Sequence, residues 1–198
     1  CVSIERIYVP SSVADAFTES FTRRVSALSQ GPALDFSTDV GSLTNAAQLE
    51  RVAGHVDDAV AKGATVLAGG RARPDLGPFF YEPTVLTGVT SDMACFANET
   101  FGPVVAIQVV DSVSEAISAA NASEFGLNAS IFSSSRRRAR SLAHRLDAGS
   151  VNINEGSDTH GGGTWRDNYV CSSPDIGLGW KSGGNRCAKR FVRIFEAL

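Results

Sequence analysis

Two groups of residues in this chain carry side chains that could take part in chemistry. Cys1 places a thiol just before a strand-like segment at 4–9, and Glu99 and Phe101 place a carboxylate and an aromatic ring just before an apolar run. Ligands gather at strand ends in open α/β sheets, so both positions are candidates for catalysis. A structural alternative is open for each: a small buried thiol at Cys1, and a packed turn around Phe101.

The elements that must position these residues alternate between strand and helix. Apolar runs rich in β-branched residues predict strands, and apolar residues at helical spacing predict helices. The predicted elements are strands at 4–9, 64–68, 83–89, 103–110, 129–132 and 150–154, and helices at 12–30, 44–62, 112–121 and 135–147. Strand 103–110 is apolar almost throughout, as in strands covered on both faces. The fold class is therefore α/β with a parallel sheet.

The charge of the chain gives no indication of a nucleic-acid partner. The 198 residues carry a formal net charge of −3 and 43% hydrophobic residues, which suits a globular core. Arg136, Arg137, Arg138 and Arg140 form a basic cluster, but inward residues at helical spacing interrupt it. We expect the arginines to form the solvated face of a helix, with no nucleic acid bound and no membrane span.

The cysteines favour a reducing compartment. Cys1, Cys95, Cys171 and Cys187 form no CxxC pair and are too few for a disulfide scaffold. His160 does not stand at zinc-ligand spacing from Cys171, so we expect no metal site. The expected location is the cytoplasm.

Several motifs resemble the aldehyde dehydrogenases in their order and spacing, from residue 1 to about residue 156. They are Cys1 followed by Arg6, the segment Glu99-Thr-Phe-Gly-Pro-Val104, and the segments at 69–70, 80–86, 121–127 and 149–154. Segments at 41–43, 55–58 and 70–77 are most similar to succinate-semialdehyde dehydrogenases within that family. The resemblance implies an incomplete parallel-sheet catalytic domain of the aldehyde dehydrogenase type.

The resemblance also implies an activity and three site residues. Cys1 would attack an aldehyde, pass a hydride from the adduct to NAD or NADP, and hold a thioester that water hydrolyses to the acid. Glu99 would accept hydrogen bonds from the nicotinamide ribose, and Phe101 would lie near the nicotinamide ring. The implied substrate is a small aldehyde, succinate semialdehyde foremost, and the full-length protein is expected to be a homo-oligomer.

Two departures from the family pattern lead to further expectations. The cofactor domain, the general base and the oxyanion-hole asparagine precede the nucleophile in the family, and no residue of this chain corresponds to them. We therefore expect the chain alone to be inactive. Residues 157–198 lack the family's later motifs, so we divide the chain into a dehydrogenase fragment at 1–156 and a divergent or frame-shifted tail at 157–198. A shift of reading frame would fall near 157–160, and the tail is expected to end in a helix at 186–198.

Two alternative functions stay open. One is a noncatalytic assembly module or pseudoenzyme that keeps the fold without a cofactor domain. The other is a cysteine hydrolase, which would need a histidine partner for Cys1. His55 and His144 both fall within predicted helices, and no motif links either one to Cys1.

Overall fold

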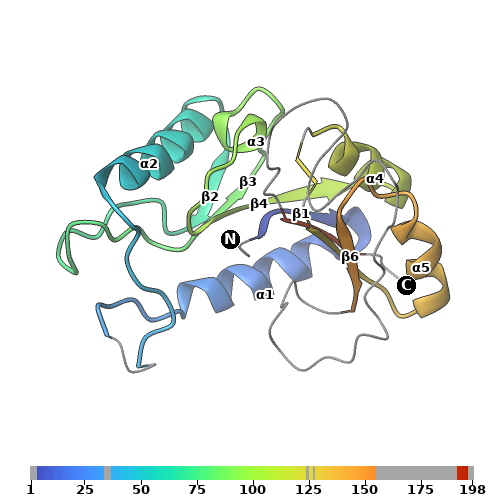
Figure 1. The fold of residues 1–198 in the computed structure, drawn as a ribbon, viewed down its shortest axis with the longest axis horizontal. Helices are drawn as coiled ribbons and strands as arrows, with labels where there is room; N and C mark the ends of the chain where they lie inside the picture. Colours follow the sequence, from blue (N-terminus) through green and yellow to red (C-terminus); the bar gives the residue numbers. More distant parts are fainter. Residues whose placement is uncertain (1–3, 34–36, 124, 127, 155–190, 196–198) are drawn as a thin grey trace. The chain divides into compact units, whose positions relative to one another are not determined.

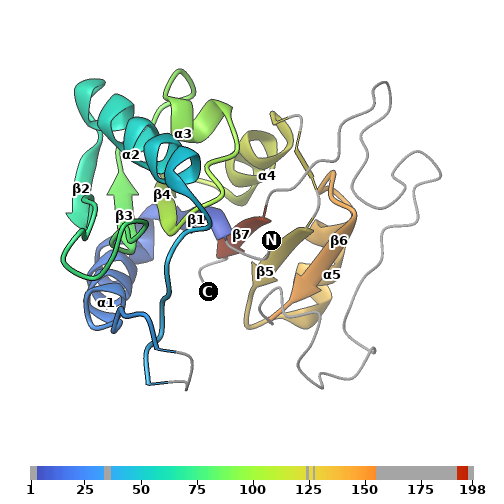
Figure 2. The ribbon, with the colours of Figure 1, turned by 60° about the vertical axis from the view of Figure 1, so that its left-hand side comes forward.

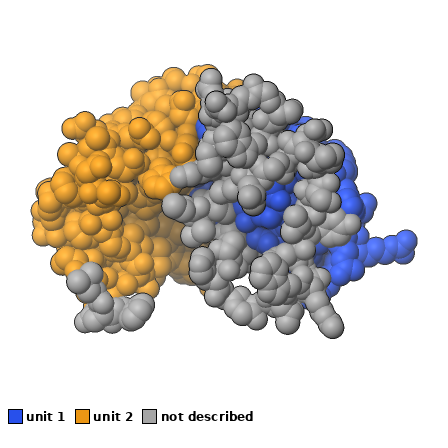
Figure 3. All heavy atoms as spheres, viewed as in Figure 1, with its two compact units in different colours: residues 1–14, 109–198 blue, residues 15–108 orange. Residues whose placement is uncertain are grey.

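The computed structural model describes residues 4–33, 37–123, 125–126, 128–154 and 191–195. The chain divides into two compact units, residues 1–14 with 109–198 and residues 15–108 (Figure 3). Strands and helices alternate along much of it (Figure 1). Among the described residues, Cys95 is a buried free thiol.

The first unit contains a parallel sheet in the order β1-β7-β5-β6. Its strands are β1 (Ile4–Pro10), β5 (Asn128–Phe132), β6 (Ser150–Ile153) and β7 (Phe191–Phe195). Its helices are α4 (Val113–Asn121) and α5 (Arg136–Ala143). Figure 2 shows β7 beside β5, where Ile131 is in register with Ile194. Apolar residues of α4 and α5 share one core cluster with Tyr8, Ile131 and Val151.

Both helices of this unit begin at the serines expected from the sequence. The Ser112 hydroxyl accepts a hydrogen bond from the Glu115 amide, and the Glu115 carboxylate accepts one from the Asp111 amide. Ser135 caps α5 in the same way, because its hydroxyl accepts from the Arg138 amide. These bonds satisfy amides that a helix start leaves without an intrahelical partner.

The arginines of α5 lie where the sequence predicts. The four arginines at 136–138 and 140 are exposed, whereas Ala139, Leu142, Ala143 and Leu146 are buried. The helix therefore follows the apolar spacing of its sequence.

Among its described residues, the second unit holds three strands and three helices. The strands are β2 (Thr65–Ala68), β3 (Thr84–Thr87) and β4 (Val104–Val110), and the last two residues of β4 belong to the first unit. The helices are α1 (Ala14–Ser26), preceded by a 3₁₀ turn at Ser11–Val13, α2 (Ala46–Ala61) and α3 (Ala94–Ala97). β3 pairs parallel with β4 and antiparallel with β2. The core of this unit includes Val52, Val56, Leu86 and Met93.

The α/β class with a parallel sheet is confirmed, but the expected helix at 186–198 is wrong. Residues Phe191–Phe195 form strand β7, with parallel partners on both sides. The segment is rich in aromatic and β-branched residues, which favour strands, and this preference outweighs its weak helical spacing. The tail residues 155–190 lie outside the described residues.

Candidate active site

Two of the three predicted site residues, Glu99 and Phe101, lie in the segment that joins α3 to β4. Glu99 is half-buried, and Phe101 is 37% exposed. Phe101 has a φ of 53°, in the left-handed region that non-glycine residues rarely occupy. Cys1 lies outside the described residues, so its predicted role stays a prediction. The structure thus presents the carboxylate and the aromatic ring on one short segment with an unusual backbone.

Helix α2 holds this segment with a single face. Gln48, Val52 and His55 are spaced four and three residues apart, so they lie on one side of the helix. The Gln48 side-chain amide donates hydrogen bonds to the backbone carbonyls of Thr100 and Phe101, both at 2.8 Å. The peptide groups before and after the Cα of Phe101 are therefore both bonded to α2.

Two closer contacts follow along the same face. Thr100 is 2% exposed, and its hydroxyl lies 3.0 Å from Nδ1 of His55. Gly102 approaches the helix so closely that an added Cβ would lie 2.4 Å from Cγ2 of Val52. Only glycine fits this approach without a shift of buried Val52. The close packing against α2 thereby explains why a glycine stands at position 102.

Helix α3, which precedes the segment, is anchored further along α2. The Asp58 carboxylate accepts a hydrogen bond from the Ala94 amide at 2.7 Å and pairs with Lys62 at 2.8 Å. The hydrogen bond from Lys62, followed by the one from the Ala94 amide, lowers the pKa of Asp58. The Lys62 ammonium also donates to the Asp92 carbonyl. Helices α2 and α3 therefore lie side by side (Figures 1 and 2).

The other end of the segment enters the sheet. The Thr84 amide donates to the Pro103 carbonyl at 2.7 Å, and Thr84 is in register with Val104. Residues 98–103 are thus held at α3, along α2 and at β3. A carboxylate on such a fixed backbone can accept hydrogen bonds from two adjacent hydroxyls, and an exposed aromatic ring can pack on a flat ligand. A carboxylate that accepts hydrogen bonds, next to an exposed aromatic ring, fits a ribose with an attached planar ring.

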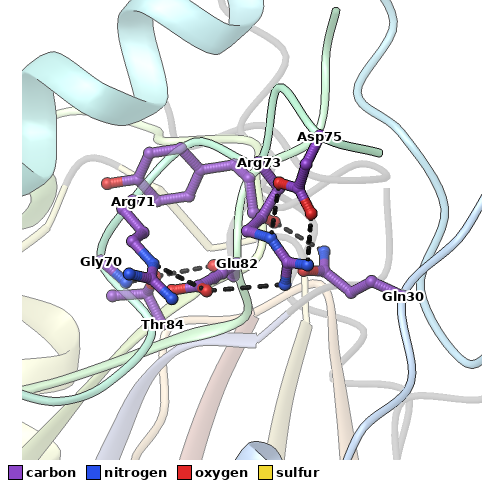
Figure 4. Close-up of polar contacts among 8 residues, drawn as sticks. Gln30, Gly70, Arg71, Arg73, Asp75, Glu82 and Thr84 are labelled. Carbon is purple, nitrogen blue, oxygen red and sulfur yellow. Dashed lines mark hydrogen bonds and ion pairs between the residues drawn. The ribbon is translucent and has the colours of Figure 1, made fainter. Parts of the chain in front are cut away.

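A second polar cluster in this unit connects the loop between β2 and β3 (Figure 4). Glu82 pairs with Arg71 at 3.0 Å and with Arg73 at 3.7 Å, and Arg73 makes two hydrogen bonds to Asp75. The Thr84 hydroxyl accepts from the Gly70 amide. An open groove of about 460 Å³ runs beside Arg73 and Glu82. Because these charges already pair with one another, we assign the cluster to loop stability.

Gln48 is the residue of this site that the sequence interpretation missed. The available signal was its spacing from Val52 and His55, which places the three on one face of α2. Nothing in the sequence shows that this face meets residues 98–102, because the contact joins segments about fifty residues apart.

Two further findings concern the described residues. They contain no group of three or more His, Cys, Asp or Glu side chains that could hold a metal ion. Among the helices that the structure describes, none is long and apolar enough to cross a membrane.

Comparison with known proteins defines the class. The aldehyde dehydrogenase family model matches residues 1–164, and the chain belongs to this family. It is 56% identical over 156 residues to a Mycolicibacterium smegmatis protein provisionally named an NADP(+) succinate-semialdehyde dehydrogenase, covering 79% of this chain and 30% of that protein. It is 39% identical over 199 residues to the Mycolicibacterium paratuberculosis succinate-semialdehyde dehydrogenase [NADP(+)], covering 98% of this chain and 39% of that protein.

A solved structure is similar as well. The succinate-semialdehyde dehydrogenase of Burkholderia pseudomallei superposes with a TM-score of 0.74 at 39% identity, over 78% of this chain and 32% of that one. The chain thus spans between 30% and 39% of the length of the two curated relatives described above.

Proposed function

We propose that this chain is part of the catalytic domain of an NADP-dependent dehydrogenase that oxidises succinate semialdehyde to the acid. The observation that carries the proposal is the Glu99–Phe101 segment, fixed by Gln48 with a carboxylate and a ring accessible. The names of the relatives support this substrate and NADP as the cofactor, with NAD as the alternative.

In the proposed reaction, the Cys1 thiolate attacks the aldehyde carbon, and a carbon–sulfur bond forms while the carbonyl π bond opens to an oxyanion. NADP, when bound, would supply the acceptor for the hydride that leaves this carbon as its carbonyl re-forms. Cys1 then carries a thioester, and water cleaves its carbon–sulfur bond, releasing the acid and restoring the thiol. Glu99 would accept hydrogen bonds from the nicotinamide ribose, and Phe101 would hold the nicotinamide ring.

The isolated chain is expected to be inactive. It spans 30% of the M. smegmatis relative, and the family resemblance implies a cofactor domain and a general base that precede the nucleophile. Addition of NADP and succinate semialdehyde to the purified 198-residue chain should therefore produce no NADPH absorbance at 340 nm. Measurable turnover would contradict this part of the proposal.

A chimera tests the catalytic role directly. The matching 156-residue segment of the M. smegmatis relative is replaced by residues 1–156 of this chain. The chimera should reduce NADP when succinate semialdehyde is added, and Cys1→Ser should lower kcat by at least about a thousandfold, because the nucleophile is lost. Cys95→Ser is the matched control, since Cys95 is the buried thiol of α3, and its kcat should stay within about twofold.

The same chimera separates the proposal from its rival. A chimera that folds and assembles but does not oxidise the aldehyde would favour a noncatalytic assembly module. If Cys1→Ser and Cys95→Ser lower kcat equally, the assignment of Cys1 as nucleophile is wrong. Replacement of NADP by NAD in the same assay decides the choice of cofactor.

The proposal also includes compartment, assembly and the domain boundary. A free buried thiol at Cys95 fits the cytoplasm, and the full-length protein is proposed to be a homo-oligomer. Cell fractionation and light scattering of the chimera test these two points.

Residues 157–198 are proposed to be divergent or frame-shifted, and resequencing the codons for residues 157–160 decides between the two.

A further inference from the structure

We propose that Gln48 is a positioning residue for the cofactor, acting through the backbone of Thr100 and Phe101. The inference rests on the proposed function, in which Glu99 and Phe101 contact the nicotinamide half of NADP. Gln48 itself need not touch the cofactor. Its contribution is to hold Phe101 in a backbone conformation that this residue would otherwise leave.

The backbone of Phe101 requires such a constraint. At a φ of 53°, the Cβ of Phe101 is crowded against the neighbouring backbone, which is unfavourable for any residue except glycine and, less so, asparagine or aspartate. Its ring is 37% exposed and therefore only partly fixed by packing. Hydrogen bonds to the flanking carbonyls can therefore help to maintain the conformation.

Gln48 supplies these bonds with both hydrogens of one amide group. Its Nε2 lies 2.8 Å from the Thr100 carbonyl and 2.8 Å from the Phe101 carbonyl, one on each side of the unusual φ. A glutamine side chain carries two donors on one nitrogen, whereas a glutamate side chain of the same length has none when ionised. The site therefore requires an amide rather than merely a long polar side chain.

Gln48 is itself placed by the start of α2. The Asn45 side chain caps the helix, because its Oδ1 accepts a hydrogen bond from the backbone N–H of Gln48 at 2.9 Å. One and two turns further on, Val52 meets Gly102, and His55 meets the buried Thr100 hydroxyl. The first turns of α2 thus act as a rigid template for residues 100–102. Glu99 and Phe101 stay on the accessible side because Thr100 between them is buried.

The test uses Gln48→Glu, which removes both donors at almost constant size. Glu50→Gln is the control, because Glu50 is exposed on the same helix. In the 198-residue chain, ¹³C backbone shifts and ³J couplings measured by NMR report the φ of Phe101. We expect Gln48→Glu to move Phe101 out of the left-handed region and Glu50→Gln to leave it there. Gln48→Met, which adds no charge, should act as Gln48→Glu does.

The catalytic readout uses the chimera that carries residues 1–156. Gln48→Glu should raise the KM for NADP about tenfold, equivalent to about 1.4 kcal/mol, and leave the KM for the aldehyde within about twofold. Lowering the pH toward the pKa of the new carboxyl should recover part of the affinity, because a protonated carboxyl regains one donor. A merely structural role would change both KM values and show no such recovery.

The outcomes are separable from those of the proposed function. If Phe101 keeps its φ in both Gln48 variants, the positioning role is wrong whatever the chimera does. If Phe101 moves but the KM for NADP does not change in an active chimera, the role of Gln48 in cofactor binding is wrong. If the parent chimera is inactive, the proposed function fails, and the NMR experiment still decides whether Gln48 holds Phe101.

Discussion

Phe101 and Asn154 are the two non-glycine residues with positive φ in the described part of the chain, and they reach this conformation by different means. Asn154 stabilises its own turn, since its side chain accepts from the Ser133 amide and donates to the Ser133 carbonyl, both at 2.8 Å. Asparagine also tolerates the left-handed region well. Phenylalanine does not share this tolerance, and the Phe101 carbonyl accepts a hydrogen bond from Gln48. We propose that the conformation of Phe101 is held by Gln48, which lies on a distant helix.

At the same scale, Tyr81 gives a prediction at alkaline pH. The side chain is 2% exposed, and burial, followed by the nearby charges of Asp57 and Glu82, raises its pKa from 10.0 to about 12. The folded state therefore keeps the proton after the unfolded state has lost it. Stability is complete below pH 10 and falls between pH 10 and about 12.

The free energy of unfolding is expected to fall by about 1.4 kcal/mol per pH unit between pH 10 and about 12. Urea titrations at several pH values measure it. Tyr81→Phe should flatten the decline above pH 10 while leaving the trend below pH 9 parallel to that of the parent. An equally steep decline in the variant would assign the alkaline sensitivity to another group.

At the scale of elements, α2 determines the geometry of the candidate site. Its face from Gln48 to Asp58 meets the chain from Ala94 to Gly102, so one helix fixes a segment that has little regular structure of its own. The sequence predicts the helix from apolar spacing. It does not predict the partner, because the partner segment shows no periodicity and the contacts are long-range.

Two glycines of the second unit predict opposite changes in stability when each is replaced by alanine. Gly54 lies exposed within α2 with no atom within 4 Å of an added Cβ, so Gly54→Ala should stabilise the protein by about 0.5–1 kcal/mol. Gly69 follows β2 with a φ of 69°, and an added Cβ would lie 2.3 Å from the Pro83 carbonyl oxygen. Gly69→Ala should therefore destabilise by about 2 kcal/mol or more. Urea titration measures both, and equal effects of the two substitutions would contradict the assigned geometry.

The helices of the first unit were more predictable than its last strand. Ser112 and Ser135 are local signals, because each cap forms within three residues. β7 has no comparable signal, since its status as a strand depends on partners at β1 and β5 far away in the chain. Local chemistry is visible in the sequence, whereas pairing over long distances is not.

At the scale of the whole molecule, β7 connects the two ends of the sequence. It is in register with β1 on one side and β5 on the other, within the first unit. A chain that stops after residue 190 should therefore lose amide protection in β1, β5 and β6 while keeping it in β3 and α2 of the second unit. Hydrogen exchange measured by mass spectrometry tests this expectation.

A chain that stops after Phe195 is the matched control, because it keeps β7 and should retain protection in both units. Uniform loss of protection throughout the shorter chain would mean that the second unit depends on β7 too. Unchanged protection in β5 would mean that β7 contributes little to the sheet.

The functional roles of the predicted site residues stay predictions, and only the positions of Glu99 and Phe101 can be described. Glu99 and Phe101 were identified through the resemblance of their motif, and the structure places them on one anchored segment. The role proposed for Cys1 has the same origin and awaits the chimera. Gln48 was missed because its role depends on where its amide lies in three dimensions, which neither its type nor its neighbours indicate.

The pairing of β1 with β7 also sets an order of events during synthesis. Ile4 is made well before its partner Phe191, so β1 cannot pair with β7 until the intervening chain, which includes the whole second unit, has been synthesised. The second unit is continuous from Asp15 to Gln108 and can fold while the ribosome is still working. The edge of β1 that pairs with β7 stays unpaired during this interval, and an unpaired strand edge can pair with another chain.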